Sequence, residues 1–158
     1  ASGYSAALFY TLTYALMSSA VFGVLLCAER MNCPLEDLDD LKGLSKSYPW
    51  LAFLMLLLMF SMAGIPMTVG FYAKLNILQA LVADGGIGLA IVAVVSSVIG
   101  AFYYLRVIKL MYFEEGEDIQ SAVMPTAHIS VLSIHTLSVV GLFLFPQALI
   151  ELCRQAIG

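Results

Sequence analysis

The chain has 158 residues, of which 61% are hydrophobic and 11% charged, and its mean hydropathy is +0.95. A soluble domain carries far more charge, so this composition predicts an all-α, polytopic membrane protein. The net charge of −4 comes from acids clustered at residues 36–40 and 114–118, which indicates solvated loops and no nucleic-acid partner. No nucleophile–base set, phosphate-binding loop or ligand spacing is found, and the cysteines are scattered. We therefore expect no metal, no cofactor and no soluble catalysis.

The first hydrophobic stretch, residues 4–28, predicts a membrane-spanning helix, since about 20 apolar residues cross a bilayer. Thr11, Tyr14 and Ser18 recur at helical spacing and share one polar face. Two interpretations of this face are open, hydrogen bonding to a neighbouring helix or a wetted surface along a proton path. The polar segment that follows, residues 29–48, predicts a short amphipathic piece at the membrane surface.

The second hydrophobic stretch, residues 49–83, is too long for one regular span. As a straight helix it would reach about 52 Å, whereas the hydrocarbon core of a bilayer is about 30 Å thick. Pro66 lacks an amide hydrogen and clashes with the preceding turn, while Gly64 and Gly70 lower the cost of a bend. The pattern predicts two half-helices joined near Gly64–Gly70, which together form the second of four spans.

Lys74 follows this break and is the candidate catalytic residue. It lies nine residues from the end of its span, about 13 Å along a helix, so anchoring by snorkelling is one interpretation. The break, however, would admit water to this depth, and burial disfavours the charged form of a lysine. A moving neighbouring charge would then load or unload its proton, so we expect Lys74 to carry protons.

Residues 87–113 and 127–150 predict the third and fourth spans. His135, in the fourth, has no acidic or second histidine neighbour at helical spacing, so an interhelical hydrogen bond and contact with a proton path both stay open. Most basic residues flank one side of these spans, whereas Arg154 lies on the other: Arg30, Lys42, Lys46, Arg106 and Lys109. The positive-inside rule therefore predicts cytoplasmic loops and periplasmic chain ends.

Three segments carry a family resemblance: AGIPMTVGFYAKLNIL at residues 63–78, DLKGL at 40–44 and FYYLRV at 102–107. They resemble the antiporter-like membrane subunits of respiratory complex I, and the GIP…GF…K pattern is specific to that superfamily. FPQALI at residues 145–150 resembles the closing segment of one such subunit. The resemblance covers nearly the whole chain, which lacks an initiator methionine and is expected to be a fragment.

The resemblance implies a subunit built of two inverted repeats, each with a broken helix, in the bacterial inner membrane. Residues 1–158 would form a single membrane domain, its last four spans, with Lys74 on the central proton-channel lysine. The expected partners are the missing N-terminal spans, the other membrane subunits of complex I and the lipid bilayer. Two sister subunits usually carry histidine and lysine where this chain has Tyr14 and Ser18, which sets it apart from them.

The implied function is proton translocation within an NADH–quinone oxidoreductase, without redox catalysis in this chain. The glutamate and the two further lysines of the family have no counterpart in it, so the piece alone is not expected to pump. One alternative is a subunit of a cation/proton antiporter or of a membrane-bound hydrogenase. Another is a structural membrane-arm fragment, in which Lys74 would be replaceable without effect.

Overall fold

The computed structural model describes residues 2–30, 36–116 and 126–157, and all regular structure in these residues is helical. The prediction of an all-α protein is confirmed for this part of the chain. Its elements, in chain order, are α1 (Ser2–Arg30), the 3-10 helix η1 (Leu38–Leu41), α2 (Leu44–Ser47), α3 (Pro49–Ala63), α4 (Val69–Ala83), α5 (Ile87–Phe113), α6 (Thr126–Gly141) and α7 (Pro146–Ile157).

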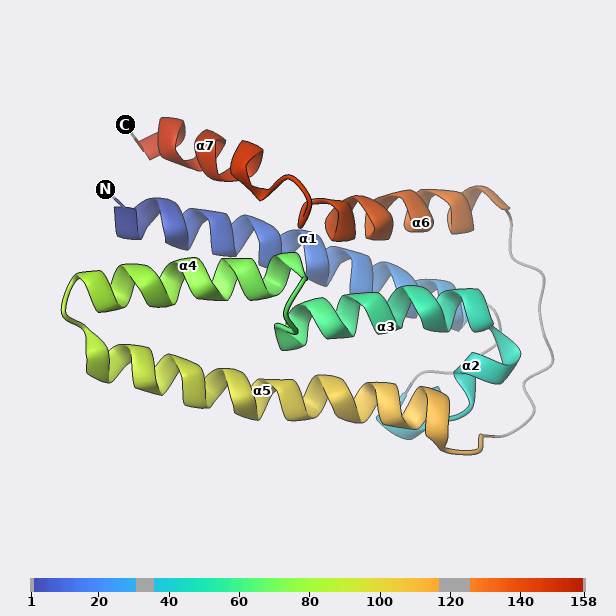
Figure 1. The fold of residues 1–158 in the computed structure, drawn as a ribbon. Coiled ribbons are helices and arrows are strands. Elements are labelled where there is room, and N and C mark those ends of the chain that lie inside the picture. Colours follow the sequence, from blue (N-terminus) through green and yellow to red (C-terminus); the bar gives the residue numbers. More distant parts are fainter. Residues whose placement is uncertain (1, 31–35, 117–125, 158) are drawn as a thin grey trace.

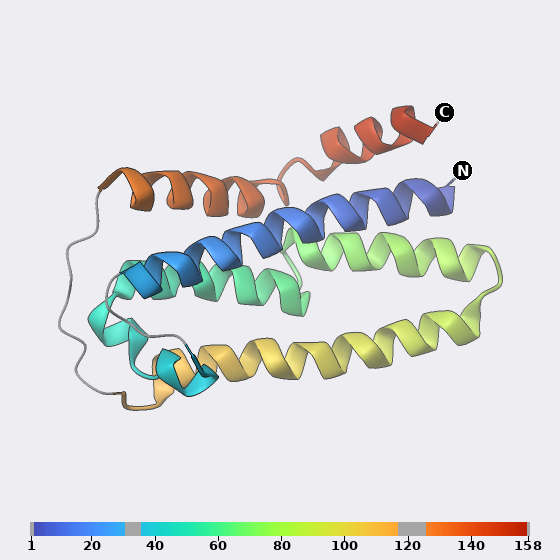
Figure 2. The ribbon, with the colours of Figure 1, turned by 180° about the vertical axis from the view of Figure 1, so that it is seen from behind.

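The long helices lie roughly side by side in layers (Figure 1). Helices α6 and α7 form one outer layer, α1 lies beneath them, α3 and α4 follow end to end, and α5 covers the far side. The view from behind has the same order (Figure 2). Helix α1 contacts both α3 and α4, as well as α6 and α7, so it supports the interrupted pair along its whole length.

Two helices, α1 and α5, are long and apolar enough to cross a membrane, and the α6–α7 pair raises the number to three if it counts as one bent span. The sequence predicts the fourth span over residues 127–150, and the structure divides this stretch between two helices. Helix α6 ends at Gly141, α7 begins at Pro146, and the two are bent by 82°. The physical reason is Pro146, which disfavours helical geometry at Phe145 and is suited to the first position of a new helix.

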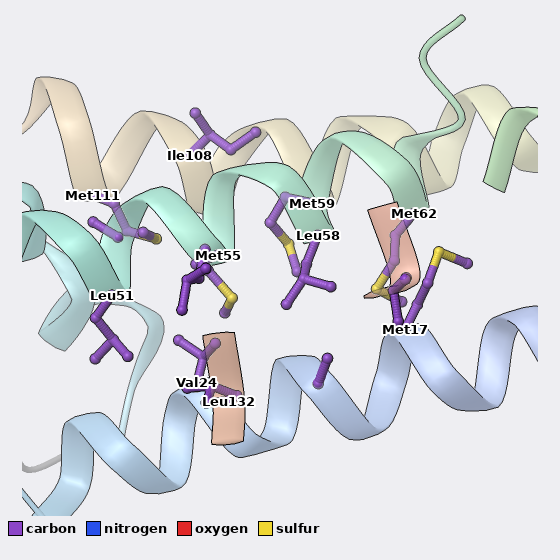
Figure 3. Close-up of a cluster of buried hydrophobic side chains, with 14 of the residues drawn as sticks. Met17, Val24, Leu51, Met55, Leu58, Met59, Met62, Ile108, Met111 and Leu132 are labelled. Carbon is purple, nitrogen blue, oxygen red and sulfur yellow. The ribbon is translucent and has the colours of Figure 1, made fainter. Parts of the chain in front are cut away.

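The core lies where α1, α3 and α5 meet and is rich in methionine (Figure 3). The flexible thioether side chain fills irregular gaps, which suits a contact with a helix that stops halfway along its neighbours. The buried methionines of this cluster are Met17, Met55, Met59, Met62 and Met111.

The segment from η1 to α2 is fixed against the end of α5. The Lys42 ammonium lies 3.0 Å from an Asp39 carboxylate oxygen and 3.7 Å from one of Glu114, and Lys109 pairs with Glu114 at 3.1 Å. The amide of Gly43 donates to the Leu110 carbonyl over 3.3 Å. These contacts close the end of the bundle that lies opposite both chain termini (Figure 1).

Candidate functional site

The candidate site is the interruption between α3 and α4. The chain leaves helical geometry at Gly64, whose φ of 83° is left-handed and favours glycine. It returns at Thr68, whose hydroxyl accepts the Phe71 amide and caps α4. Between them Met67 has a φ of 73°, which is costly for a residue with a side chain, and is 77% exposed. The local structure thus stores strain at the break.

Lys74 reaches back from α4 to the end of α3. Its ammonium donates to the Met62 carbonyl over 3.0 Å and to the Ala63 carbonyl over 3.1 Å. The amides of Gly64 and Ile65 donate hydrogen bonds to the two carbonyls that precede these, those of Phe60 and Ser61. The last four carbonyls of a helix lack partners within it, so all four orphan groups are satisfied here. Lys74 is therefore a C-terminal cap on the neighbouring half-helix, placed at the negative end of its dipole.

Gly70 is the second residue of α4 and so lies at the edge of the break. Its role is close approach: a Cβ at this position would overlap the backbone carbonyl of Ser61. The Gly70 amide donates to the Ser61 hydroxyl over 3.3 Å, and that hydroxyl donates to the Met17 sulfur over 3.1 Å. Three helices are thereby joined at one buried serine, and Gly70 lies one helical turn before Lys74 on α4.

Two cavities open onto Lys74. The first, of about 360 Å³, lies between α1, α4 and α5 and carries hydroxyl groups from Tyr10, Tyr14, Ser96, Ser97 and Tyr104. The second, of about 330 Å³, lies between the break and α5 and has mostly apolar walls, including Phe71 and Val98. Lys74 and Ser97 belong to both linings. The ammonium can therefore be approached from two directions.

Sequence reasoning found one of the tyrosines in this cavity and missed the others. The rings of Tyr10 and Tyr14 stack with centroids 6.0 Å apart, and Tyr104 lines the same cavity. Tyr10 and Tyr14 are four residues apart, a spacing that places them on one helical face. That spacing could have predicted Tyr10 from the sequence. Tyr104 lies on α5, across the cavity, and no spacing relates it to Tyr14.

The other predicted path residues do not gather around Lys74. The Thr11 hydroxyl donates to the Ala7 carbonyl of its own helix, and Ser18 lines neither of the two cavities. His135 lies across α1 from Lys74, with its Nε2 3.1 Å from the Leu16 carbonyl oxygen. Among the described residues, only Tyr14 of the predicted path shares a cavity with Lys74.

A structural metal centre has no counterpart in the described residues, which contain no group of three or more His, Cys, Asp or Glu side chains placed to hold an ion. The chemical groups available near the break are thus one amine, several hydroxyls and the carbonyls that end α3. Such groups exchange protons and bind water.

Comparisons with known proteins identify relatives of this chain. Residues 1–100 match the family described as NADH:quinone oxidoreductase/Mrp antiporter, TM. The chain is 50% identical over 157 residues to NADH-quinone oxidoreductase subunit N of Thiobacillus denitrificans and 52% identical over 159 residues to that of Cupriavidus taiwanensis. Each alignment covers 99% of this chain and 32% of the relative. The chain thus spans about a third of the length of the curated relatives it matches.

Two solved structures share the fold. Respiratory complex I from Thermus thermophilus with bound aureothin contains a similar chain, with a TM-score of 0.77, 25% identity and coverage of 94% of this chain and 34% of that one. The Mrp complex from Dietzia sp. also contains a similar chain, with a TM-score of 0.81 and 22% identity. The match covers 96% of this chain and 36% of that one. The resemblance to subunit N, which the departures at Tyr14 and Ser18 favour, is confirmed. The chain belongs to the NADH:quinone oxidoreductase/Mrp antiporter transmembrane family.

Proposed function

We propose that this chain is part of a proton-translocating membrane subunit of an NADH–quinone oxidoreductase, and that Lys74 is its proton carrier. The observation that carries the proposal is the position of the Lys74 ammonium. It is half-buried, bonded to two carbonyls at the end of α3 and bordered by two cavities. An amine in such a place exchanges protons with whichever cavity holds water.

The membrane arrangement that fits this function has four spans, with α3 and α4 as the second. Each half-helix has 15 residues, about 22 Å in length, so the pair end to end can cross a hydrocarbon core of about 30 Å. Both chain termini lie at the end of the bundle opposite α2 (Figure 1). With the basic loops cytoplasmic, these termini are periplasmic in a bacterial inner membrane.

The chain would act within a larger assembly. Its relatives are about three times as long, and we propose that residues 1–158 form a single domain, the last four spans of such a subunit, with the remaining spans completing the path. The other membrane subunits of complex I and the lipid bilayer are its further partners. Reduction of quinone by NADH would take place elsewhere in the complex.

The chemistry of the step depends on the groups that surround Lys74. The charged ammonium is favoured by the two carbonyls and by the negative end of the α3 dipole, and disfavoured by burial. A neutral amine still has two hydrogens to donate, so it can keep both hydrogen bonds when its proton leaves. A positive charge that approaches through the first cavity therefore expels the proton without opening the break.

The second candidate is a purely structural role for Lys74. The hydrogen bonds from Lys74 to the last two carbonyls of α3 favour this role. A cation/proton antiporter subunit would share the fold, but the names of the similar relatives favour the oxidoreductase. The two roles of Lys74 differ in one property: a cap needs only donors, whereas a carrier needs a proton that it can release.

The test compares Lys74→Arg, Lys74→Gln and Lys74→Ala in the complete complex, reconstituted in sealed vesicles with a pH-sensitive dye. Arginine keeps charge and donors but stays protonated at any working pH, so we expect assembly without pumping. Alanine leaves the Met62 and Ala63 carbonyls without a hydrogen-bond donor, so it should impair assembly as well as pumping. The exposed Lys46 serves as control, since Lys46→Ala should pump normally. Arginine pumping as well as lysine would refute the carrier role.

A further inference from the structure

A groove separate from the Lys74 cavities runs between α1 and α6. Its volume is about 490 Å³, and it shares no lining residue with either cavity. Apolar side chains such as Leu26 and Val131 form its walls. Gly23 lets α1 and α6 approach closely at the base of the groove, because a Cβ there would lie 2.9 Å from a methyl carbon of Leu132. The groove is therefore an apolar channel open to the outside of the bundle.

The mouth of this groove carries two basic side chains. The Arg30 guanidinium Nη1 lies 3.4 Å from His128 Nε2, and both side chains are exposed. No carboxylate within residues 2–30, 36–116 and 126–157 forms an ion pair with Arg30. One guanidinium nitrogen faces the histidine, which leaves the other donors of the fork, and the second ring nitrogen of His128, to bind an anion. The chemistry of this mouth is complementary to a phosphate group.

The depth of the groove matches one leaflet of a bilayer. Arg30 and Ser19, at its two ends, are eleven residues apart on α1, about 16 Å along the helix. Half of a hydrocarbon core is about 15 Å. At the inner end His135 donates to the Leu16 carbonyl over 3.1 Å, which seals the groove with a satisfied polar pair. A charged group at the mouth and apolar walls over one leaflet are the two features of a phospholipid site.

We propose that this groove binds an anionic phospholipid from the leaflet on the side of the basic loops. Its phosphate would contact Arg30 and His128, and one acyl chain would lie between Leu26 and Val131. Lys42 and Lys46 lie at the same end of the bundle, where basic side chains attract anionic headgroups. An apolar helix of a neighbouring subunit would leave the two basic groups without a counter-charge, so the lipid is the better match.

The experiment uses the complete complex in phosphatidylcholine vesicles with a trace of phosphatidylglycerol that carries a photoreactive diazirine on one acyl chain. After illumination, labelled peptides are identified by mass spectrometry. We expect labels on peptides of α1 and α6. Unlabelled phosphatidylglycerol should compete, whereas phosphatidylcholine with the same acyl chains and inorganic phosphate should not. Equal labelling by a phosphatidylcholine probe would overturn the charge-based selection, and competition by inorganic phosphate would identify a simple anion site.

Variants test the two halves of the site. Arg30→Gln with His128→Gln should lower labelling of these peptides about tenfold, because hydrogen bonds to a charged phosphate are lost. Arg106→Gln, which removes one charge from α5, is the matched control and should leave labelling unchanged. Val131→Trp should fill the groove and abolish labelling, whereas Leu137→Trp should not, because Leu137 does not line the groove.

Two outcomes would contradict the proposal outright. One is labelling that survives Val131→Trp. The other is a cross-link from a photoreactive residue at position 131 to another subunit, which would show that protein occupies the groove. The competition measurements need no variant, so they decide the question even where a substitution prevents assembly.

Discussion

The close contact between Gly70 and Ser61 gives a prediction about the break that does not alter Lys74 itself. In Gly70→Ala the new methyl group would overlap the Ser61 carbonyl oxygen, which belongs to the backbone and cannot rotate away. Overpacking of this kind costs about 1–3 kcal/mol. Loss of the 3.3 Å hydrogen bond from the Gly70 amide to the Ser61 hydroxyl adds about 1 kcal/mol. Replacing a helical glycine recovers about 0.5–1 kcal/mol, so the net destabilisation is about 2 kcal/mol.

The same substitution should reach Lys74, which lies one turn further along the same face of α4. To accommodate the methyl group, α4 must move away from the end of α3. The Lys74 ammonium is 3.0 Å and 3.1 Å from its two carbonyl acceptors, and a shift of about 0.5 Å takes both contacts beyond hydrogen-bond geometry. We therefore expect Gly70→Ala to lower proton pumping while Lys74 remains present.

The assay measures two quantities on the purified complex, the midpoint of thermal aggregation and the initial rate of vesicle acidification. Gly88→Ala is the matched control, because a Cβ at Gly88 has no atom within 4 Å and should be tolerated. We expect Gly70→Ala to lower both quantities and Gly88→Ala to lower neither. If the two variants behave alike, the contact at Ser61 does not hold the break in place.

Three further predictions concern other parts of the chain. Gly64→Ala should also reduce pumping, because Gly64 has a φ of 83° and a Cβ there would lie 3.1 Å from Lys74 Cδ, and acidification rates will check this. Lys42→Ala should lower the aggregation midpoint less than Gly70→Ala does, since its ion pairs are partly exposed and weak. The topology can be tested with a membrane-impermeant thiol reagent applied outside intact cells. A cysteine that replaces Glu115 should not react, whereas one that replaces Gln155 should. The reverse pattern would invert the orientation.

The Lys42 ion pairs also have a defined pH dependence. The hydrogen bond to Asp39, followed by the charges of Asp39 and Glu114, raises the pKa of Lys42 above its ordinary 10.5, with burial opposing the change. A raised pKa stabilises the fold below the unfolded value and loses that contribution as the pH rises through the folded value. The effect therefore lies above pH 10.5, and the aggregation midpoints of Lys42→Ala and the parent should keep a constant difference between pH 6 and 9.

The features that sequence could predict are those fixed by length and by backbone chemistry. Composition indicates an all-helical membrane protein, and the excess length of residues 49–83 together with Pro66 predicts an interruption. Pro146 is an equivalent signal for the bend after α6, because α7 begins at that proline. A proline marks a boundary between elements, and the residues C-terminal to it decide whether a second helix begins there.

The contacts between helices were beyond sequence reasoning, because periodicity assigns residues to faces without saying which neighbour each face meets. Thr11, Tyr14 and Ser18 share a polar face, yet only Tyr14 lines the cavity beside Lys74. The serine that approaches His135 is Ser19, at 3.4 Å, on another side of α1. The cap on α3 was equally hidden, since it depends on how far α4 is displaced from the end of α3.

The cap also changes how the two candidate roles of Lys74 relate to each other. A break at membrane depth leaves helix-end carbonyls that need donors, because lipid offers none. A lysine amine satisfies two of them in this structure and can do so in either protonation state. Among common donors, an arginine never loses its charge and a glutamine never gains one. Lysine thus holds the break closed while its charge changes, so the structural requirement selects the same residue that proton transfer needs.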